Sequence, residues 1–410
     1  MLRRLAPPVA LVAVFAAATS LGPTSDTSVS DFGLYRVYAR AVLEGQVPYR
    51  DFALEYPPGA LVPMVLAGLP DGTRGWVFRF AFGALMCACA LVVQREAARL
   101  APGRERAAAW ALVLLPVAAG AIVRERFDLF AVALAVAGLR LALDGARAGR
   151  ASAGGFALLG LGVATKLFPL VLAASCAAWL WGAGARREAV RGAAVAAGVA
   201  LAVCLPFAAL APGGFAEQAR FHAERPLQIE SLPATVLRVA GDPRLTGTPR
   251  NPDRFRSQGV EGDGAGAAAA IAGVLQLGGI LLGVALALRA GRRGDGRGLL
   301  LACAVALLAF LALGKVLSPQ YLLWIAPLAP ALYVAGARTA AALIVAALAL
   351  TQLGFPSRYF ELVRGEPLAL TLVAARDALL VAALALLASA AARTRRRPGR
   401  TGAPARGSGT

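Results

Sequence analysis

The 410-residue sequence is poor in charged residues and has almost no histidine. Charged residues make up 16%, against about 25% in soluble domains, and the single histidine, His222, cannot form a multi-histidine metal cage. No G-x-x-x-x-G-K-[ST] motif occurs, which argues against a P-loop ATPase. All five cysteines lie inside apolar runs, so a framework of loop disulfides is not expected.

What the sequence has is apolar residues, which make up 58% of the chain and lie in long runs. Because a spanning helix needs about 20 mostly apolar residues, these runs predict an all-α polytopic membrane protein with about 12 transmembrane helices. The stretch 57–70 is shorter and has proline near both ends, which predicts a re-entrant or interfacial helix. The predicted spans are 5–22, 76–94, 107–123, 127–143, 153–165, 167–184, 189–211, 265–289, 298–316, 320–336, 339–356 and 367–392.

A net charge of +19 would indicate a nucleic-acid partner in a soluble protein. Here the basic residues stand in short connectors between apolar runs, such as 186–191 (RREAVR) and 289–297 (RAGRRGDGR). Under the positive-inside rule this predicts a multi-pass cell-membrane protein with both termini in the cytoplasm, an uncleaved signal anchor and no nucleic-acid partner. The predicted parts are an integral membrane domain over 1–392, with outer loops at about 23–56 and 212–264, and a disordered basic cytoplasmic tail over 393–410.

Because only the outer loops are sizeable, we expect the chemistry on the outer face. Asp31 follows the first span, and partial desolvation there would raise the pKa of its carboxyl and make it a better proton acceptor. The alternative is that Asp31 is only a helix N-cap. Tyr35 lies one helical turn further on. Glu55 and Tyr56 begin a rigid E-Y-P-P-G segment, which could equally mark the start of a helix.

Charged residues also mark the turns between later spans. Arg126 and Asp128 belong to a tight turn that is either an anion site or a knot of interfacial ion pairs. The chain has only two lysines, Lys166 and Lys315, and each ends a predicted span at the outer face. A lysine ammonium suits a phosphate as a point charge, although snorkelling to lipid headgroups is the alternative.

The second outer loop places His222, Arg225, Gln228 and Glu230 within a few residues of one another. Such a set suits proton donation or hydrogen bonds to sugar hydroxyls, while a lone histidine is more often a structural hydrogen-bonding residue. The composition of residues 241–264 predicts a flexible linker.

Taken in order, several short motifs of this chain resemble a known family. They are SDFGLY, GQVPYRDF, EYPPG, RFD, TKLFP, HAERPLQIESLP and SPQYLLW. This series resembles the actinobacterial polytopic membrane glycosyltransferases of family 87, in the GT-C superfamily. The resemblance implies a GT-C-like helical bundle that takes a sugar, typically mannose, from a polyprenyl-phosphate donor on the outer face and passes it to a glycolipid or glycan of the cell envelope.

The resemblance also implies roles for residues. Asp31 would be the general base of an inverting transfer, with His222 as a second catalytic candidate, and Lys166, Lys315 and Arg126 would hold the donor phosphate. No cofactor is expected beyond the lipid-linked donor, and the absence of a D-x-D motif predicts a reaction without metal. The expected substrate-binding residues are Tyr35, Glu55, Tyr56, Asp128, Arg225, Gln228, Glu230, Ser318, Gln320 and Tyr321.

Three other classes of protein stay open at this point. A transporter or flippase of a lipid-linked envelope precursor would place ionisable residues in mid-span and often has inverted repeats. A non-catalytic scaffold gives no reason for Asp31, Lys166 and Lys315 to share one membrane face. An oligosaccharide polymerase or ligase would use a similar lipid-linked substrate, and the sequence separates it poorly from a glycosyltransferase.

Overall fold

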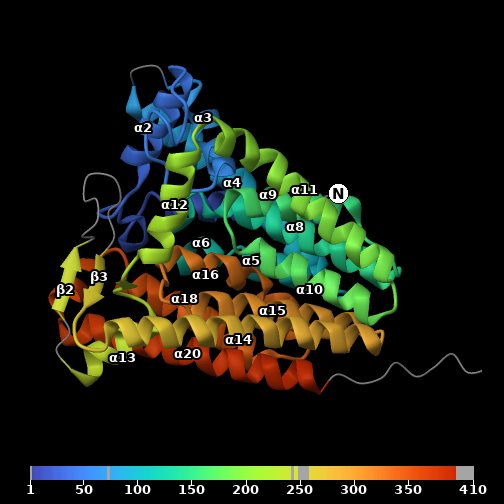
Figure 1. The fold of residues 1–410 in the computed structure, drawn as a ribbon. Coiled ribbons are helices and arrows are strands. Elements are labelled where there is room, and N and C mark those ends of the chain that lie inside the picture. Colours follow the sequence, from blue (N-terminus) through green and yellow to red (C-terminus); the bar gives the residue numbers. More distant parts are fainter. Residues whose placement is uncertain (1, 72–73, 242–243, 248–257, 394–410) are drawn as a thin grey trace, which may run out of the picture.

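The structure, a computed structural model, consists almost entirely of helices (Figure 1) and describes residues 2–71, 74–241, 244–247 and 258–393. Among these residues five helices are long and apolar enough to cross a membrane: α4 (Gly75–Arg99), α8 (Asp128–Arg147), α11 (Arg186–Leu210), α14 (Ala265–Arg292) and α20 (Pro367–Ala392). The shorter apolar helices are α1 (Leu2–Ala18), α3 (Leu61–Gly68), α9 (Ala153–Thr165), α10 (Pro169–Gly182), α15 (Gly296–Ala312) and α18 (Arg338–Gly354). The chain is a multi-pass, all-α membrane protein, as predicted, but twelve spans are not confirmed.

Two of the predicted spans are wrong as continuous helices. The run 107–123 is divided into α5 (Glu105–Leu112), α6 (Leu115–Ala119) and α7 (Ile122–Glu125), and the run 320–336 into η3 (Pro319–Tyr321), α16 (Leu322–Ile325), η4 (Ala326–Leu328) and α17 (Ala329–Val334). A proline stands at the start of α6, η3, η4 and α17. Because proline lacks the N–H and clashes with the preceding turn, hydropathy alone overestimates the length of these helices.

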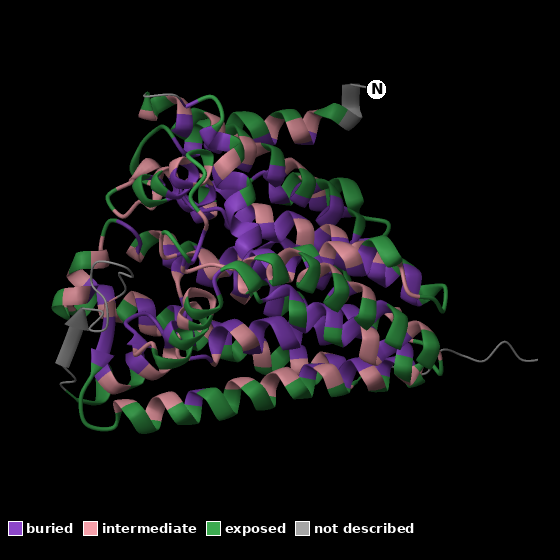
Figure 2. Ribbon diagram, turned by 45° about the horizontal axis from the view of Figure 1, so that its top comes forward, coloured by how far each residue is buried: buried purple, intermediate pink, exposed green. Residues whose placement is uncertain are grey.

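The helices differ sharply in how far they are buried. In α15 every residue from Gly298 to Ala309 is buried, whereas α11 buries only Ala189, Gly192 and Ala196. Figure 2 shows the purple centre and the green outer helices of the bundle. An apolar helix with so much exposed surface would be unfavourable in water, so α11 and much of α14 face lipid.

Close helix contacts in the bundle depend on glycine. Gly291 of α14 lies against the carbonyl of Trp179 in α10, and Gly182 of α10 lies against the carbonyl of Leu288 in α14, so neither position has room for a Cβ. Small residues allow membrane helices to approach closely, which fixes the crossing of α10 and α14.

Both predicted outer loops are folded. The first contains η1 (Pro23–Ser25) and α2 (Phe32–Leu43). It is followed by η2 (Pro58–Ala60), which leads into α3. The short helix predicted within 57–70 is therefore present as α3. The second contains α12 (Pro212–Glu224), β1 (Leu227–Gln228), α13 (Leu232–Ala240), β2 (Arg244–Gly247) and β3 (Gln258–Glu261). The helix α19 (Tyr359–Arg364) precedes α20.

The predicted flexible linker over 241–264 is wrong where the structure describes it. Strands β1, β3 and β2 form an antiparallel sheet in that order, with Leu227 opposite Val260. Leu227, Ile229 and Val260 are buried in a small second core with Leu362 of α19. Buried apolar residues therefore hold part of the segment 241–264 in a folded sheet, although its composition predicted only a flexible linker.

The bundle has two distinct ends. The strands, α2 and α12 lie toward one end (left in Figure 1), while α1 begins and α20 ends toward the other (right). The end that carries α2 and α12 is called the loop end below, and the opposite end is the distal end. Most of the predicted disordered tail, from residue 394 onward, lies outside the described residues.

Candidate active site

An ion pair between Asp31 and Arg126 joins two distant segments at the loop end of the bundle. Asp31 precedes α2 and Arg126 follows α7. Arg126 also donates a hydrogen bond from Nη2 to the carbonyl of Val29, at 3.2 Å. Asp31 occupies the N-cap position of α2, but its side chain makes no capping hydrogen bond, so capping does not explain its presence.

The two partners of this ion pair differ in exposure. The Asp31 side chain is 29% exposed and that of Arg126 only 7%, and Nε of Arg126 is buried without a hydrogen-bond partner among the described residues. Burial lowers the pKa of Arg126 to about 10, against the opposing effect of Asp128, Tyr359 and Glu230. At neutral pH Arg126 therefore stays charged, and its Nε–H group is available to donate a hydrogen bond. Both properties suit an anionic ligand.

A second ion pair lies deeper. Nζ of Lys166, between α9 and α10, is 2.7 Å from Oδ1 of Asp128, and Trp324 Nε1 donates to the same oxygen at 2.7 Å. The ammonium also lies 4.6 Å from the centre of the Phe127 ring and 5.5 Å from that of Tyr321. Burial lowers the pKa of Lys166, while Asp128 opposes this shift. The other carboxylate oxygen of Asp128 is buried without a partner among the described residues.

Aromatic rings connect the two ion pairs. The Tyr35 and Tyr56 rings lie against Phe127, with centroid distances of 5.7 Å and 4.8 Å. The Tyr35 hydroxyl donates to Oδ2 of Asp31 at 3.3 Å. Burial, followed by the charges of Asp128 and Glu55, raises the pKa of Tyr35 well above its ordinary value, so its phenol stays protonated as a donor.

The two outer loops meet at the E-Y-P-P-G segment. The Glu55 carbonyl accepts from Gln218 Nε2 at 3.3 Å and lies 2.8 Å from Nε2 of His222, both in α12. The Tyr56 carbonyl accepts from the Tyr49 hydroxyl at 2.6 Å. Gly59 lies so close to the last turn of α9 that a Cβ would be 2.6 Å from the Ala164 carbonyl, which brings the segment next to Lys166.

Lys315 and the S-P-Q-Y motif join the second loop from another direction. Nζ of Lys315 donates to the Ala223 carbonyl at 2.6 Å, and the carbonyl of Lys315 accepts from the Gln228 N–H at 2.9 Å. Desolvation and the positive Arg225 lower the pKa of Lys315. Ser318 Oγ donates to Gln320 Oε1 at 2.7 Å.

A buried network around Glu230 includes residues that the sequence analysis missed. Arg376 of α20 donates to the Glu230 carbonyl, lies 3.9 Å from its carboxylate and pairs with Asp377 at 2.9 Å. Thr235 donates to Asp377 at 2.7 Å. An adjacent Arg and Asp within an apolar span are unusual enough to indicate function, and that signal was available in the sequence of α20.

Burial raises the pKa of Glu230 to about 7, with Arg376 and Arg126 opposing and Asp377 adding to the shift. A small cavity borders Glu230, Tyr359 and Arg376. This carboxyl therefore changes its charge near neutral pH, and its pKa is affected by the charge of Arg126.

Most predicted site residues belong to this connected region. Asp31 contacts both Tyr35 and Arg126, and Lys166 contacts both Asp128 and the Tyr321 ring. Arg225 influences Lys315 and Tyr359 through its charge. In the described part of the chain, no group of three or more His, Cys, Asp or Glu residues could hold a metal ion; a reaction without metal stays a prediction.

The fold and site define a multi-pass membrane protein with charged and aromatic residues gathered at one end of an apolar bundle. Comparison with protein families identifies glycosyltransferase family 87 over residues 54–319, and the chain belongs to this family. It is therefore a membrane glycosyltransferase. Asp31, Tyr35 and the Arg376–Asp377 pair lie outside the matched residues. The curated proteins include no match to this chain.

Proposed function

We propose that this glycosyltransferase moves a hexose, mannose in the first instance, from a polyprenyl-phosphate donor to a glycolipid or glycan acceptor of the cell envelope. The observation that supports this most is the ion pair of a partly exposed carboxylate, Asp31, with a buried arginine that has a spare donor, Arg126. A base and an anion-binding group thus lie side by side at the end of a lipid-facing bundle, where a lipid-linked phosphate could reach them.

Binding of the donor exchanges the partners of Arg126. Its guanidinium moves from the Asp31 carboxylate to the donor phosphate, for which bidentate pairing is favourable. Asp31 is then released from its counter-ion and gains basicity at the moment the acceptor needs it. Lys315 adds positive charge from the second loop, and Lys166 does so if its pair with Asp128 opens.

The reaction is a single inverting displacement at the anomeric carbon. The acceptor hydroxyl loses its proton to Asp31 while its oxygen forms the new bond to C1. The bond between C1 and the phosphate oxygen breaks, and polyprenyl phosphate leaves as a dianion. Because the leaving group gains charge, electrostatic stabilisation by Arg126 and the lysines matters more than a general acid.

The aromatic and polar side chains around this centre would bind the sugar and the acceptor. Rings such as Tyr35, Tyr56 and Tyr321 can contact an apolar sugar face, and their hydroxyls can hydrogen-bond. His222 would act from the rim, where it contacts the Glu55 backbone. The remaining proposed polar contacts are Glu55, Asp128, Arg225, Gln228, Glu230, Ser318 and Gln320.

We assign the loop end to the extracytoplasmic side of the cell membrane and both termini to the cytoplasm. Two features support this orientation. The arginine-rich connectors 186–191 and 289–297 lie at the distal end, at the start of α11 and the end of α14, and such connectors stay in the cytoplasm. The start of α1 and the end of α20 also lie toward that end (Figure 1).

The deciding experiment measures transfer from labelled polyprenyl-phosphate-mannose in membranes that contain the wild type or Asp31→Asn. Removal of the general base is expected to lower the rate about 10²- to 10⁴-fold. Glu44→Gln is the matched control, because Glu44 is an exposed carboxylate in the same loop, and its rate should equal that of the wild type. Undiminished transfer by Asp31→Asn would exclude Asp31 as the base.

The same assay separates the proposal from a transporter or flippase of a lipid-linked precursor. A glycosyltransferase forms a new glycoside and releases polyprenyl phosphate in equal amounts, whereas a flippase moves the intact donor across the bilayer. Movement of the donor without any released polyprenyl phosphate, with several lipid-linked sugars tested, would contradict the transfer reaction.

A further inference from the structure

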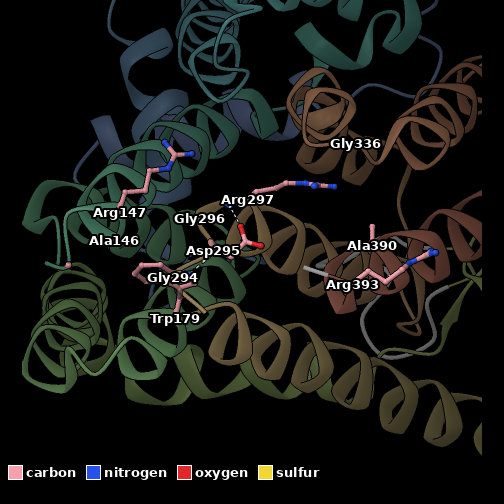
Figure 3. A pocket seen from close by; sticks show the side chains of 11 residues that line it. Ala146, Arg147, Trp179, Gly294, Asp295, Gly296, Arg297, Gly336, Ala390 and Arg393 are labelled. Atoms are coloured by element: carbon pink, nitrogen blue, oxygen red, sulfur yellow. Dashed lines mark hydrogen bonds between the residues drawn. The ribbon is translucent and has the colours of Figure 1, made fainter. Parts of the chain in front are cut away.

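A cleft at the distal end of the bundle lies far from the candidate active site. Its volume is about 900 Å³, and it is formed by the ends of α8, α10 and α20, the turn between α14 and α15, and the turn after α17 (Figure 3). The residues that matter here are Arg147, Trp179, Asp295, Arg297, Gly336 and Arg393. None of them takes part in the proposed transfer, so the cleft needs a separate explanation.

The described lining carries a net positive charge, because it contains Arg147, Arg297 and Arg393 against one acidic residue. Arg393 donates from Nε to the carbonyl of Ser389 at 3.2 Å, which leaves its positive charge without a counter-ion in the ranges that the structure describes. Among the described residues, Asp295 is the only acidic residue that lines the cleft. Its Oδ1 accepts from the backbone N–H groups of Arg297 and Gly298 at 3.0 Å each. The carboxylate thus caps α15 rather than neutralising the arginines. Within the described part of the chain, the guanidinium of Arg297 has no hydrogen-bond or ion-pair partner, whereas Arg147 pairs with Asp144 at 3.2 Å.

Two glycines lie directly against these arginines. A Cβ at Gly336, where φ is +85°, would lie 2.8 Å from Nη2 of Arg297, and one at Gly296 would lie 3.2 Å from Cγ of Arg147. Figure 3 shows the Arg297 side chain extended between Gly336 and the end of α20 that carries Arg393. The Arg297 and Arg147 side chains therefore pack against the backbone that borders the cleft.

The surroundings are those of a membrane surface. Trp179 lines the cleft and donates through Nε1 to the Asp295 carbonyl at 3.2 Å. Nearby on α10, Trp181 is 48% exposed and lies 5.6 Å beneath the guanidinium of Arg186. Exposed Trp with Arg at the ends of apolar helices is typical of the headgroup level.

We infer that this cleft binds the phosphate of an anionic phospholipid headgroup, with Arg297 and Arg147 as its main cations. Basic pockets between membrane helices are suited to such headgroups, and each arginine contributes about 1 kcal/mol near an anionic surface, or about fivefold in affinity. The apolar flanks of the helices accept the acyl chains while the cleft takes the phosphate.

The test uses the full-length protein purified in detergent micelles that contain phosphatidylglycerol or phosphatidylcholine, with bound lipid counted by native mass spectrometry. In the double variant Arg147→Gln, Arg297→Gln, retention of phosphatidylglycerol should fall by more than tenfold, and phosphatidylcholine should be unaffected. The control, Arg104→Gln with Arg187→Gln, removes the same charge from exposed positions outside the cleft and should retain phosphatidylglycerol like the wild type.

A conservative variant, competition by soluble phosphates and a transfer assay complete the test. Arg297→Lys keeps the charge and should keep most of the binding, which separates loss of the site from loss of the fold. Equal retention in the cleft variant and its control would overturn the inference. Displacement of phosphatidylglycerol by soluble glycerol phosphate or inorganic phosphate would also overturn it, because the site would then serve a water-soluble anion. Sugar transfer by the cleft variant should match that of the wild type, so failure here leaves the proposed reaction standing.

Discussion

At the scale of single residues, Glu230 is a buried carboxyl group whose pKa lies in the physiological range. Its pKa is raised to about 7, chiefly by burial, so it is mostly protonated below pH 7 and mostly ionised above. If the ionised form accepts hydrogen bonds from sugar hydroxyls, kcat/KM for sugar transfer should rise as the pH increases through 7. In Glu230→Gln this rise should disappear.

The measurement is a pH profile of transfer from about pH 5.5 to 8.5 in membranes, for Glu230→Gln and for Glu44→Gln as its exposed counterpart. His222 has a lowered pKa, mainly through desolvation of its ring, so its titration belongs to lower pH than that of Glu230. An unchanged inflection near pH 7 in Glu230→Gln would show that another group controls the profile.

Lys166 and Asp128 allow a structural role to be separated from a binding role. Removal of one partner from a buried ion pair typically costs about 3–5 kcal/mol, because the other charge stays buried alone. Lys166→Met should therefore lower the unfolding free energy by about that amount. The double variant Lys166→Met, Asp128→Asn removes both charges and should recover most of the stability.

Transfer activity in that double variant decides what Lys166 does. If Lys166 also holds the donor phosphate, transfer by the double variant stays below that of Asp128→Asn alone, although the fold is restored. Stability is measured by unfolding in mixed detergent micelles, and transfer with the labelled donor. Recovery of both stability and transfer would assign Lys166 a purely structural role and leave Arg126 and Lys315 as the phosphate ligands.

At the scale of elements, the apolar runs predicted most helices, because length and hydropathy are local properties of the sequence. They did not predict the breaks near Pro116 and Pro327, since a window of mean hydropathy takes no notice of a missing N–H. The sheet was missed for another reason. Strands as short as β1 have little local signal, and their pairing with β3 depends on contacts some thirty residues away.

The candidate site was predictable to the extent that motifs carry it. Asp31, Arg126 and Lys166 stand in recognisable motifs, and the structure places them in one region. Their partners were not predictable, because Asp128 could equally have paired with Arg126 in the same turn. Arg376 was missed because the span 367–392 was read for its mean hydropathy, which a single ionic pair hardly changes.

Helix packing gives a prediction with an internal control on α14. Gly291→Ala would push a Cβ against the backbone carbonyl of Trp179, which cannot move aside, whereas a Cβ at Gly273 would meet nothing within 4 Å. Overpacking costs about 1–3 kcal/mol, so Gly291→Ala should lower the thermal transition in detergent. Gly273→Ala should leave it unchanged or raise it, because alanine favours a helix by roughly 0.5–1 kcal/mol over glycine. Equal transitions would contradict the close α10–α14 crossing.

At the scale of the whole molecule, the net charge of +19 is unevenly distributed along the bundle. Arginines gather at the connectors of the distal end, and the residues proposed for transfer lie at the loop end. The bundle between them buries α15 and exposes α11 to lipid. The proposed transfer site and the proposed lipid cleft thus lie at opposite ends of the bundle.

That separation predicts which positions a membrane-impermeant thiol reagent can reach in intact cells. Glu44→Cys lies at the end of α2 and Arg187→Cys near the start of α11, and both positions are exposed. In a background without the native cysteines, Glu44→Cys should react in intact cells, whereas Arg187→Cys should react only after the membrane is opened. The reverse pattern would place the loop end in the cytoplasm, and a polyprenyl-phosphate sugar on the outer face could then not be the donor.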